Sequence, residues 1–306
     1  WKQFEMATII APDDFSPSED AESIKTACVG LGTDEQALIS ILAHRNSSQR
    51  HQISKTFSLI YRQDLISQLK SEISGQFEKS MRYWMMPADE RDASMAHSAL
   101  LTSPPNYKII IELSCDRNPE ELLAVKRAYH HLYKRSLEED VASHTVGEIR
   151  KLLMALVSVY RYDGPEVDNK QAAIDAEIIN KSFTEEELIR VLSTKSRSQI
   201  LATFEQFKKH YNESITKGLK GNRDEYHSLL RNAIRCVKNR EKYFVRVLRS
   251  SNEEDISRVI VSRAEKDLAV IQNLFSKKTG DDFARAVERG TSGDNKAFML
   301  ALLGNF

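Results

Sequence analysis

The chain has 306 residues, of which 41% are hydrophobic and 29% are charged, and only 11 glycines and 7 prolines; this composition is typical of a helical protein with a sizeable core. Lys and Arg together number 44, as do Asp and Glu, so the formal net charge of zero excludes a global attraction to nucleic acid. The sequence has neither an apolar run long enough to cross a bilayer nor a secretory signal, from which we expect a cytoplasmic protein.

The chain begins with a tail, residues 1–16, that contains prolines and little periodicity. From residue 17 onward apolar side chains recur every three or four positions, as at Leu65, Leu69, Ile73 and Phe77. This spacing is typical of amphipathic helices. No segment shows the alternation of a strand, so we predict an all-α protein.

The stretch CVGLGTDE, residues 28–35, is the first candidate site. Its two glycines can reach positive φ angles, which lets a short loop turn its carbonyl oxygens toward one point. Thr33 is expected to be the N-cap of the helix that follows, with Asp34 and Glu35 in the first turn of that helix. Carbonyl oxygens that converge beside a carboxylate suit Ca²⁺. The alternative is a simple glycine-rich turn between two helices.

Four segments of the chain repeat one another. Each has an apolar helix that ends in a basic residue, a polar turn, a long helix and a further helix; the basic residues are Arg45, Arg117, Lys195 and Arg263, separated by 72, 78 and 68 positions. In three copies a glycine follows 30 positions later, at Gly75, Gly147 and Gly293. We predict repeats of about five helices at 17–87, 88–160, 171–242 and 243–306. The linker 161–170 is expected to divide the chain into two halves of two repeats.

This pattern resembles the annexin family over essentially the whole chain after the tail. The resemblance is carried by four copies of about 70 residues, the GxGT loop, and an acid on a later helix of the same copy. Several stretches are similar to plant annexins, among them His44-Arg45-Asn46 and the linker that begins at Arg161. The resemblance implies four annexin repeats arranged as two halves in a curved disk.

The resemblance also implies a calcium site. In annexins the ion takes backbone carbonyls of the GxG loop and a carboxylate 39 positions after the loop threonine, which is Glu72 here. The implied ligands are the carbonyl oxygens of Cys28, Gly30 and Gly32 and both carboxylate oxygens of Glu72, with Thr33 and Glu35 similar to an accessory site. Ca²⁺ is thus the implied cofactor.

The other three copies depart from the family pattern. The same offsets from the basic residues give Thr102, Pro104 and His144 in the second copy, Asn180, Ser182 and Asn222 in the third, and Leu248, Ser250 and Gly290 in the fourth. None has a glycine pair or an acid at the required place, so we predict one intact site, in the first repeat. Arg249 and Lys181 are candidates for direct help with anionic lipid, against the alternative of ordinary surface charges.

The function implied by the resemblance is calcium-dependent binding to acidic phospholipid membranes, mainly through the first repeat. Such a protein would be peripheral on membranes when calcium rises, with an adaptor, trafficking or stress-response role and no catalysis. The alternatives are a calcium-independent membrane or protein scaffold, a peroxidase-like activity at His44, and calcium conduction. Nucleic acid is not expected as a partner.

Further residues match positions of interest in annexins. Asp92, Glu112, Arg117 and Arg258 match charged residues that line a polar passage between the halves, and buried charges of this kind require pairing, Asp92 with Arg117 and Glu112 with Arg258. The alternative is purely structural pairing.

Cys115 and Cys236 match a candidate redox pair of plant relatives, against the alternative of two inert buried thiols. Ile189-Arg190-Val191 loosely resembles an actin-binding tripeptide, which would make actin a protein partner, although amphipathic helices produce such triplets by chance.

Overall fold

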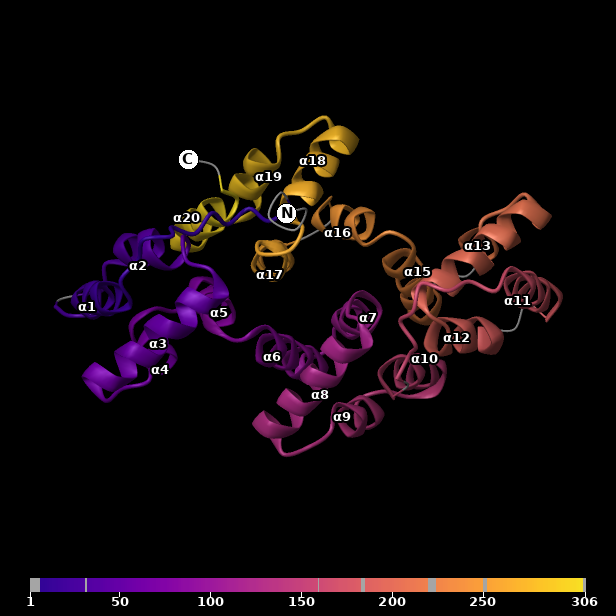
Figure 1. The fold of residues 1–306 in the computed structure, drawn as a ribbon, viewed down its shortest axis with the longest axis horizontal. Helices are drawn as coiled ribbons and strands as arrows, with labels where there is room; N and C mark the ends of the chain where they lie inside the picture. Colours follow the sequence, from indigo (N-terminus) through magenta and orange to yellow (C-terminus); the bar gives the residue numbers. More distant parts are fainter. Residues whose placement is uncertain are drawn as a thin grey trace. The chain divides into compact units, whose positions relative to one another are not determined.

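The computed structural model describes residues 6–30, 32–158, 160–182, 185–219, 224–249 and 252–304. Across these residues the chain forms twenty helices and no strand (Figure 1). Five consecutive helices make up each of the four repeats, which confirms the all-α fold class. Within the described ranges, no helix is both long enough and apolar enough to span a membrane.

The helices of the first repeat are α1 (Pro17–Ala27), α2 (Glu35–Leu42), α3 (Ser47–Tyr61), α4 (Leu65–Glu72) and α5 (Gly75–Met85). Those of the second are α6 (Ala88–Leu101), α7 (Tyr107–Asp116), α8 (Pro119–Tyr133), α9 (Leu137–Ser143) and α10 (Gly147–Ser158). Those of the third are α11 (Asn169–Ser182), α12 (Glu185–Thr194), α13 (Arg197–Tyr211), α14 (Ile215–Gly218) and α15 (Glu225–Lys238). Those of the fourth are α16 (Arg240–Arg249), α17 (Glu253–Arg263), α18 (Leu268–Thr279), α19 (Phe283–Gly290) and α20 (Gly293–Leu302).

The third helix of every repeat ends at the same place in the repeat. Its last turn is closed by a residue in the left-handed conformation, at Arg62, Lys134, Asn212 and Gly280, each seventeen positions after the basic residue of its repeat. A left-handed residue stops a helix because the next amide then bonds backward to the last turn. The basic residue is therefore in register in all four repeats, the third included.

An acid on the first helix pairs with the basic residue that follows the second helix in three repeats. Asp20 accepts two hydrogen bonds from Arg45, at 2.6 and 2.8 Å. Asp92 accepts one from Arg117 at 2.6 Å, again across 25 positions. In the third repeat Asp175 lies 3.9 Å from Lys195, only 20 positions away. The connection between its first two helices is five residues shorter than in the first repeat.

The chain forms two compact units that do not follow its order. Unit 1 contains residues 1–88 and 244–306, which are the first and fourth repeats, and unit 2 contains residues 89–243, which are the second and third. The expectation that the linker 161–170 separates two halves is therefore wrong, because that linker lies inside unit 2.

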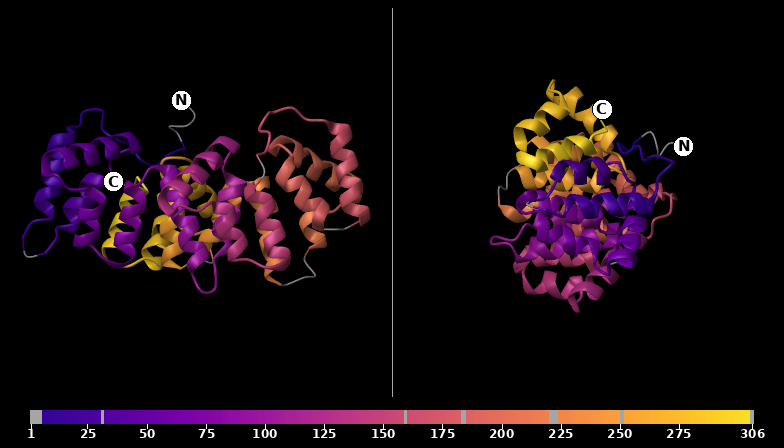
Figure 2. Two further views of the ribbon diagram at one scale, coloured as in Figure 1. Left: turned by 90° about the horizontal axis from the view of Figure 1, so that it is seen from below. Right: turned by 90° about the vertical axis from the view of Figure 1, so that its left-hand side faces the viewer.

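Long-range contacts within unit 1 explain why the first and fourth repeats belong together. The Arg50 side chain is 2% exposed; it lies 3.6 Å over the Trp84 ring and pairs with Glu265 at 2.8 Å. The backbone amide of Thr8 donates to Ala264 at 2.8 Å, and its hydroxyl donates to the last turn of α20. The N-terminal segment thus runs along the C-terminal helices of this unit (Figure 2).

Unit 2 is built from one continuous stretch of chain. Within it α7 packs against α15, α11 packs against α13, and α10 contacts α12. Its core contains fully buried aliphatic side chains, among them Ile110, Ile111, Leu230 and Ile234. Burying each such side chain contributes about 1.5–3 kcal/mol to folding.

Candidate functional site

The loop between α1 and α2 contains the glycine pair. Gly30 and Gly32 have φ angles of 129° and 109°, which side-chain-bearing residues rarely adopt, and a Cβ at either position would meet no atom within 4 Å. The glycines are thus required by backbone conformation rather than by crowding. The amide of Asp34 donates to Ala27 at 2.9 Å and closes the loop. Leu31 lies outside the described residues.

Asp34, rather than Thr33, is the N-cap of α2, and its carboxylate accepts the Ala37 amide at 2.9 Å. The predicted capping role of Thr33 is therefore wrong. A carboxylate at this position also suits the positive end of the helix dipole, which favours Asp over Thr. Thr33 is left free for a different contact.

Thr33 connects the glycine loop to the distant acid. Its hydroxyl lies 3.2 Å from Oε2 of Glu72 and 3.3 Å from the Glu72 carbonyl oxygen, across 39 positions of sequence. The other carboxylate oxygen, Oε1, accepts a hydrogen bond from Gln68 at 2.7 Å. Glu72 is the last residue of α4, so this helix delivers the carboxylate to the loop. The structure thus brings Thr33 and Glu72 together.

Gln68 is a site residue that the sequence analysis missed. It lies one helical turn before Glu72, so the two side chains share a face of α4. This i, i+4 spacing is the signal that could have identified it. With Thr33 on one oxygen and Gln68 on the other, the carboxylate is held from both sides.

The loop carbonyl oxygens complete an oxygen-rich surface. Among the described residues, the carbonyl oxygens of Cys28, Gly30 and Gly32 accept no hydrogen bond. The Cys28 thiol is buried, and burial together with the negative charge of Glu72 raises its pKa to about 11. The thiol is therefore neutral near pH 7. Among Cys28, Gly30, Gly32 and Glu72, only the Glu72 side chain carries a formal charge.

Acidic side chains surround the loop. A hollow of about 780 Å³ adjoins it, lined by Glu19, Glu22, Ser23, Thr26, Ala27, Val29, Gly32, Asp34 and Ala37. Glu35, the predicted accessory residue, is half-buried as the first residue of α2 and has no hydrogen-bond or ion-pair partner within the described chain. These acids give the surface a negative charge that favours a cation and disfavours an anion.

The described residues contain no cluster of three or more His, Cys, Asp or Glu side chains able to hold a metal. The loop at 28–34 and Glu72 differ from such a cluster, because most of their oxygen atoms belong to the backbone. Backbone carbonyls plus one carboxylate form a hard oxygen set, which fits Ca²⁺.

The corresponding loops in the other repeats are shorter. Seven residues separate α1 from α2, whereas five separate α6 from α7, two separate α11 from α12, and three separate α16 from α17. Asn180 lies within α11, and Ser250 and Asn222 lie outside the described residues.

In the second and fourth repeats, hydrogen bonds within the protein join the two loops that correspond to those of the calcium site. At the position of Glu72, the second repeat has His144, whose carbonyl accepts the Tyr107 hydroxyl at 2.7 Å. In the fourth, Glu253 accepts the Ser292 amide at 3.0 Å. In both repeats an internal hydrogen bond therefore joins the two loops that Thr33 and Glu72 join in the first.

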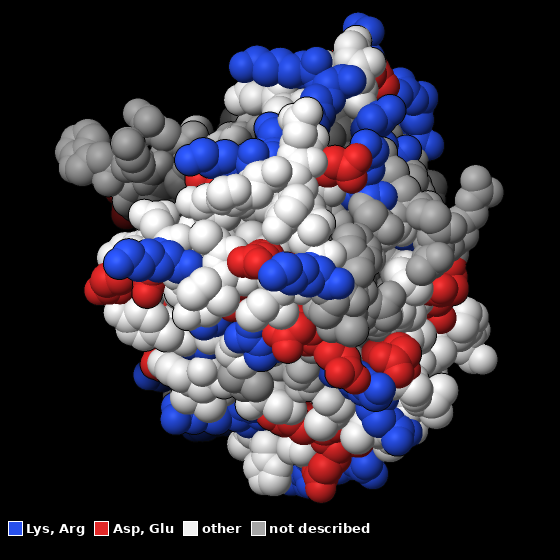
Figure 3. All heavy atoms as spheres, turned by 90° about the vertical axis from the view of Figure 1, so that its right-hand side faces the viewer, with Lys and Arg blue, Asp and Glu red and all other residues white. Residues whose placement is uncertain are grey.

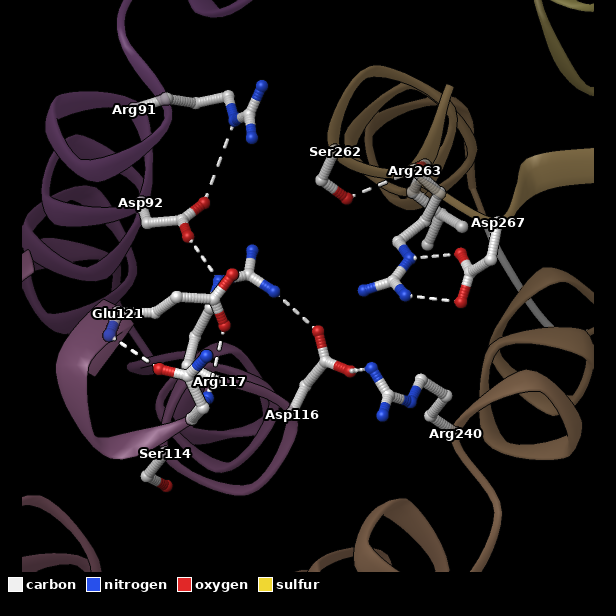
Figure 4. Close-up of polar contacts among 12 residues, drawn as sticks. Arg91, Asp92, Ser114, Asp116, Arg117, Glu121, Arg240, Ser262, Arg263 and Asp267 are labelled. Atoms are coloured by element: carbon white, nitrogen blue, oxygen red, sulfur yellow. Dashed lines mark hydrogen bonds and ion pairs between the residues drawn. The ribbon is translucent and has the colours of Figure 1, made fainter. Parts of the chain in front are cut away.

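Buried ion pairs lie inside unit 2 (Figure 4). Asp92 lies between Arg91 and Arg117, and Asp116 lies between Arg117 and Arg240. The expected pairing of Asp92 with Arg117 is present.

For the other expected pair, Glu112 accepts the Tyr243 hydroxyl at 3.0 Å in unit 2, and Arg258 pairs with Asp255 at 2.8 Å in unit 1. The polar passage itself stays a prediction.

The two cysteines of the expected redox pair are buried. Cys115 is 3% exposed and Cys236 is fully buried, and they lie on α7 and α15, which pack together. Burial raises the pKa of the Cys115 thiol to about 11, which makes the reactive thiolate scarce. A redox role for the pair stays a prediction.

The structure also places His44 and the tripeptide Ile189-Arg190-Val191. The Nδ1 atom of His44 lies 2.8 Å from the Ser40 carbonyl oxygen, next to the end of α2. Ile189 and Val191 are buried in α12, so two of the three residues that resemble an actin-binding tripeptide are not on the surface.

The two basic candidates differ in their surroundings. Lys181 pairs with Glu177, and Arg249 is the last residue of α16. On the face shown in Figure 3, Lys and Arg lie beside Asp and Glu, with basic side chains more frequent toward the upper edge. The presence of both signs of charge on this face agrees with the formal net charge of zero.

Four tandem repeats of five helices, with a glycine loop facing an acid in the first, define the class of protein. The annexin family model matches residues 19–84, 91–156, 174–231 and 245–302, so the chain belongs to the annexin family. It is 45% identical to annexin-like protein RJ4 from Fragaria ananassa, over 98% of this chain and 99% of that one. This relative is from a plant, in agreement with the plant-like stretches.

Solved annexin structures share the fold. Annexin III is 32% identical, covers 98% of this chain with 97% of its own, and superposes with a TM-score of 0.92. Calcium-bound annexin (Sm)1 is 26% identical, covers 98% of this chain with 93% of its own, and has a TM-score of 0.85. As a family, annexins bind Ca²⁺ and associate peripherally with phospholipid membranes, and they are generally not enzymes.

Proposed function

We propose that this protein binds acidic phospholipid membranes in a calcium-dependent way, through a single calcium site in the first repeat. The observation that carries the proposal is the contact between Thr33 and Glu72, which brings a carboxylate from α4 to the glycine loop. The carbonyl oxygens of Cys28, Gly30 and Gly32 and the Glu72 carboxylate would hold the ion. Bound Ca²⁺ supplies the positive charge that the neutral chain lacks.

The chain's own residues prepare this site in three ways. The positive φ angles at Gly30 and Gly32 fix the turn of the loop. Thr33 and Gln68 hold the carboxylate toward the loop, which reduces the side-chain entropy lost when a ligand binds. The negative charge of Glu72 and of the acids around the loop disfavours an anionic headgroup until a cation is present.

A single site of this composition predicts weak binding to calcium alone. One carboxylate and several neutral carbonyls correspond to affinities of about 10⁻⁴–10⁻³ M. An annexin with several such loops in one chain would gain avidity for the membrane, and a protein with one loop would not. Lipid phosphate is therefore expected to strengthen calcium binding, because it adds an anionic ligand next to the ion.

The test is co-sedimentation with vesicles of phosphatidylserine and phosphatidylcholine across a series of free calcium concentrations. Glu72→Gln removes the charge and retains the shape of the side chain, and it is expected to raise the calcium concentration for half-maximal binding at least tenfold. Glu288→Gln is the matched control, because it removes the same charge from an exposed glutamate on α19, outside the proposed site. Equal calcium requirements for wild type and Glu72→Gln would refute the assignment.

A further inference from the structure

Two arginines of unit 2 have side chains that donate no hydrogen bond. Arg197 is the first residue of α13, and Arg240 is the first residue of α16. Neither guanidinium group donates to an acceptor anywhere in the described ranges of the chain. A guanidinium group presents several N–H donors in a planar fork, and this fork matches the oxygen atoms of an oxyanion. Both side chains are therefore able to take a ligand that accepts hydrogen bonds.

The nearby acids neutralise these two arginines only in part. Asp116 lies 3.6 Å from Arg240, but the same carboxylate also pairs with the buried Arg117 (Figure 4). Glu241 lies 3.9 Å from Arg240. Both distances are longer than those of a hydrogen bond. Arg197 forms no ion pair with any residue that the structure describes. The positive charges of Arg197 and Arg240 are therefore not balanced by closely paired carboxylates.

Arg197 lies where a positive charge is disfavoured. Its side chain is half-buried, and burial lowers its pKa. The positive charge of Arg240 lowers this pKa further, and the nearby acids Asp116 and Glu241 oppose it with smaller effects. The first turn of a helix is also positive, so the dipole of α13 disfavours a cation at this position. The surroundings of Arg197 thus lack negative charge.

A third arginine adds positive charge nearby and is not paired with an acid. Arg161 donates to the Ser114 carbonyl oxygen at 3.1 Å, and it forms no ion pair among the described residues. Burial raises the pKa of the Cys115 thiol, and the positive charges of Arg161 and Arg197 oppose this rise, so both arginines lie near that thiol. An anion beside Arg197 is therefore attracted by more than one positive charge.

We propose that Arg197 and Arg240 hold a small tetrahedral oxyanion, of the chemical class of inorganic phosphate or sulfate. Each guanidinium fork donates to oxygen atoms of the anion. The anion supplies the hydrogen-bond acceptors and the negative charge that both side chains lack. Binding requires neither calcium nor lipid, and the site lies in unit 2, whereas the calcium site lies in unit 1. The inference therefore goes beyond the membrane-binding function proposed above.

A ligand site and a structural ion pair predict opposite effects of removing Arg197. A ligand that binds only the folded protein stabilises it by mass action, so the oxyanion should raise the stability of unit 2. Without the anion, Arg197 is a half-buried cation that lacks a paired acid. Its removal should then cost no stability, whereas removal of one partner of a buried ion pair is strongly destabilising.

The test is thermal unfolding of the full chain, followed by far-UV circular dichroism in EGTA and without lipid. Inorganic phosphate is varied while sodium chloride keeps the ionic strength constant. Saturating phosphate should raise the midpoint temperature of wild type by about 3 °C. Arg197→Gln and Arg240→Gln should lose most of this rise. The matched control is Arg127→Gln, which removes the same charge from an exposed arginine on α8 of unit 2 and should keep the rise.

Two further anions separate the sources of the signal. Sulfate should act as phosphate does, because it has the same shape and a similar charge. Its general stabilising effect on folded proteins appears equally in Arg197→Gln and cancels in the comparison. Glycerol 3-phosphate carries the phosphate of a lipid headgroup. A rise with phosphate but not with this ester supports a site for free anions, and an equal rise with both supports a site that also accepts headgroup phosphate.

Three results would overturn the inference. The first is an equal rise with phosphate in wild type and Arg197→Gln. The second is a rise that sodium chloride alone reproduces in wild type, which would indicate screening of charge rather than binding. The third is an Arg197→Gln variant that unfolds well below wild type without phosphate, which would indicate a structural role. None of these results bears on the calcium site, because the assay contains neither calcium nor lipid.

Discussion

Replacing Thr33 by valine tests how the metal-free protein prepares its site. Valine is close to threonine in size and shape, so the substitution removes the hydroxyl and little else. That hydroxyl lies 3.2 Å from Oε2 and 3.3 Å from the carbonyl oxygen of Glu72. Because Asp34 caps α2, loss of the hydroxyl leaves the start of that helix unchanged. The direct effect falls on the Glu72 carboxylate.

The size of the effect follows from the contact. A hydrogen bond to a charged group contributes about 1.5–3 kcal/mol when buried, and the partial exposure of both Thr33 and Glu72 reduces this to about 1 kcal/mol. If Thr33 holds the carboxylate ready for the ion, about 1 kcal/mol corresponds to roughly a fivefold loss of calcium affinity. Thr33→Ser keeps the hydroxyl and should stay within about twofold of wild type.

The assay is vesicle sedimentation over a series of free calcium concentrations, with far-UV circular dichroism as the check on folding. Thr33→Val should require about five times more calcium for half-maximal binding. Equal requirements for the valine and serine variants would show that the hydroxyl plays no part. A large loss of helix in Thr33→Val would contradict the assignment of the cap to Asp34.

Two further predictions concern unit 2. Burial raises the pKa of the Cys115 thiol from 9.0 to about 11, so its contribution to stability is complete below pH 9 and is lost as the pH rises to 11. At pH 10 this loss is about 1.4 kcal/mol. Between pH 8 and pH 10, the free energy of unfolding measured with urea should therefore fall by about 1.4 kcal/mol less for Cys115→Ala than for wild type. Equal decreases for the two proteins would contradict this prediction. Asp92→Asn should lower the free energy of unfolding by about 3 kcal/mol, since it leaves the buried Arg117 short of one partner. A decrease well under about 1 kcal/mol in urea unfolding would mean that Asp116 alone satisfies Arg117.

Part of the site follows from the sequence. The resemblance to annexins implies the pairing of Thr33 with Glu72, and the internal repeats show that the other copies have no similar pair. Local chemistry was harder to predict. Thr33 and Asp34 are both good caps, and only the backbone geometry of the loop shows which one faces the helix and which one faces Glu72.

The grouping of repeats could not be predicted from periodicity. Helical spacing shows which face of a helix is buried, but it does not show which distant helix covers that face. The first and fourth repeats are joined by contacts such as Arg50 with Glu265, across 215 positions, and Lys79 with Glu254, across 175. Neither partner stands out in its own segment, so the linker between the second and third repeats was the more visible boundary.

The discontinuous composition of unit 1 bears on how the protein is made. Unit 2 occupies residues 89–243, so all of it is synthesised before residues 244–306 are added. Unit 1 cannot be completed until residues 244–306 are present, and until then Arg50, which lies over the Trp84 ring, lacks Glu265. Domains generally fold as units during synthesis. The first repeat is synthesised long before the fourth repeat, with which it forms unit 1. It is therefore the part of this chain that is exposed to chaperones for the longest time.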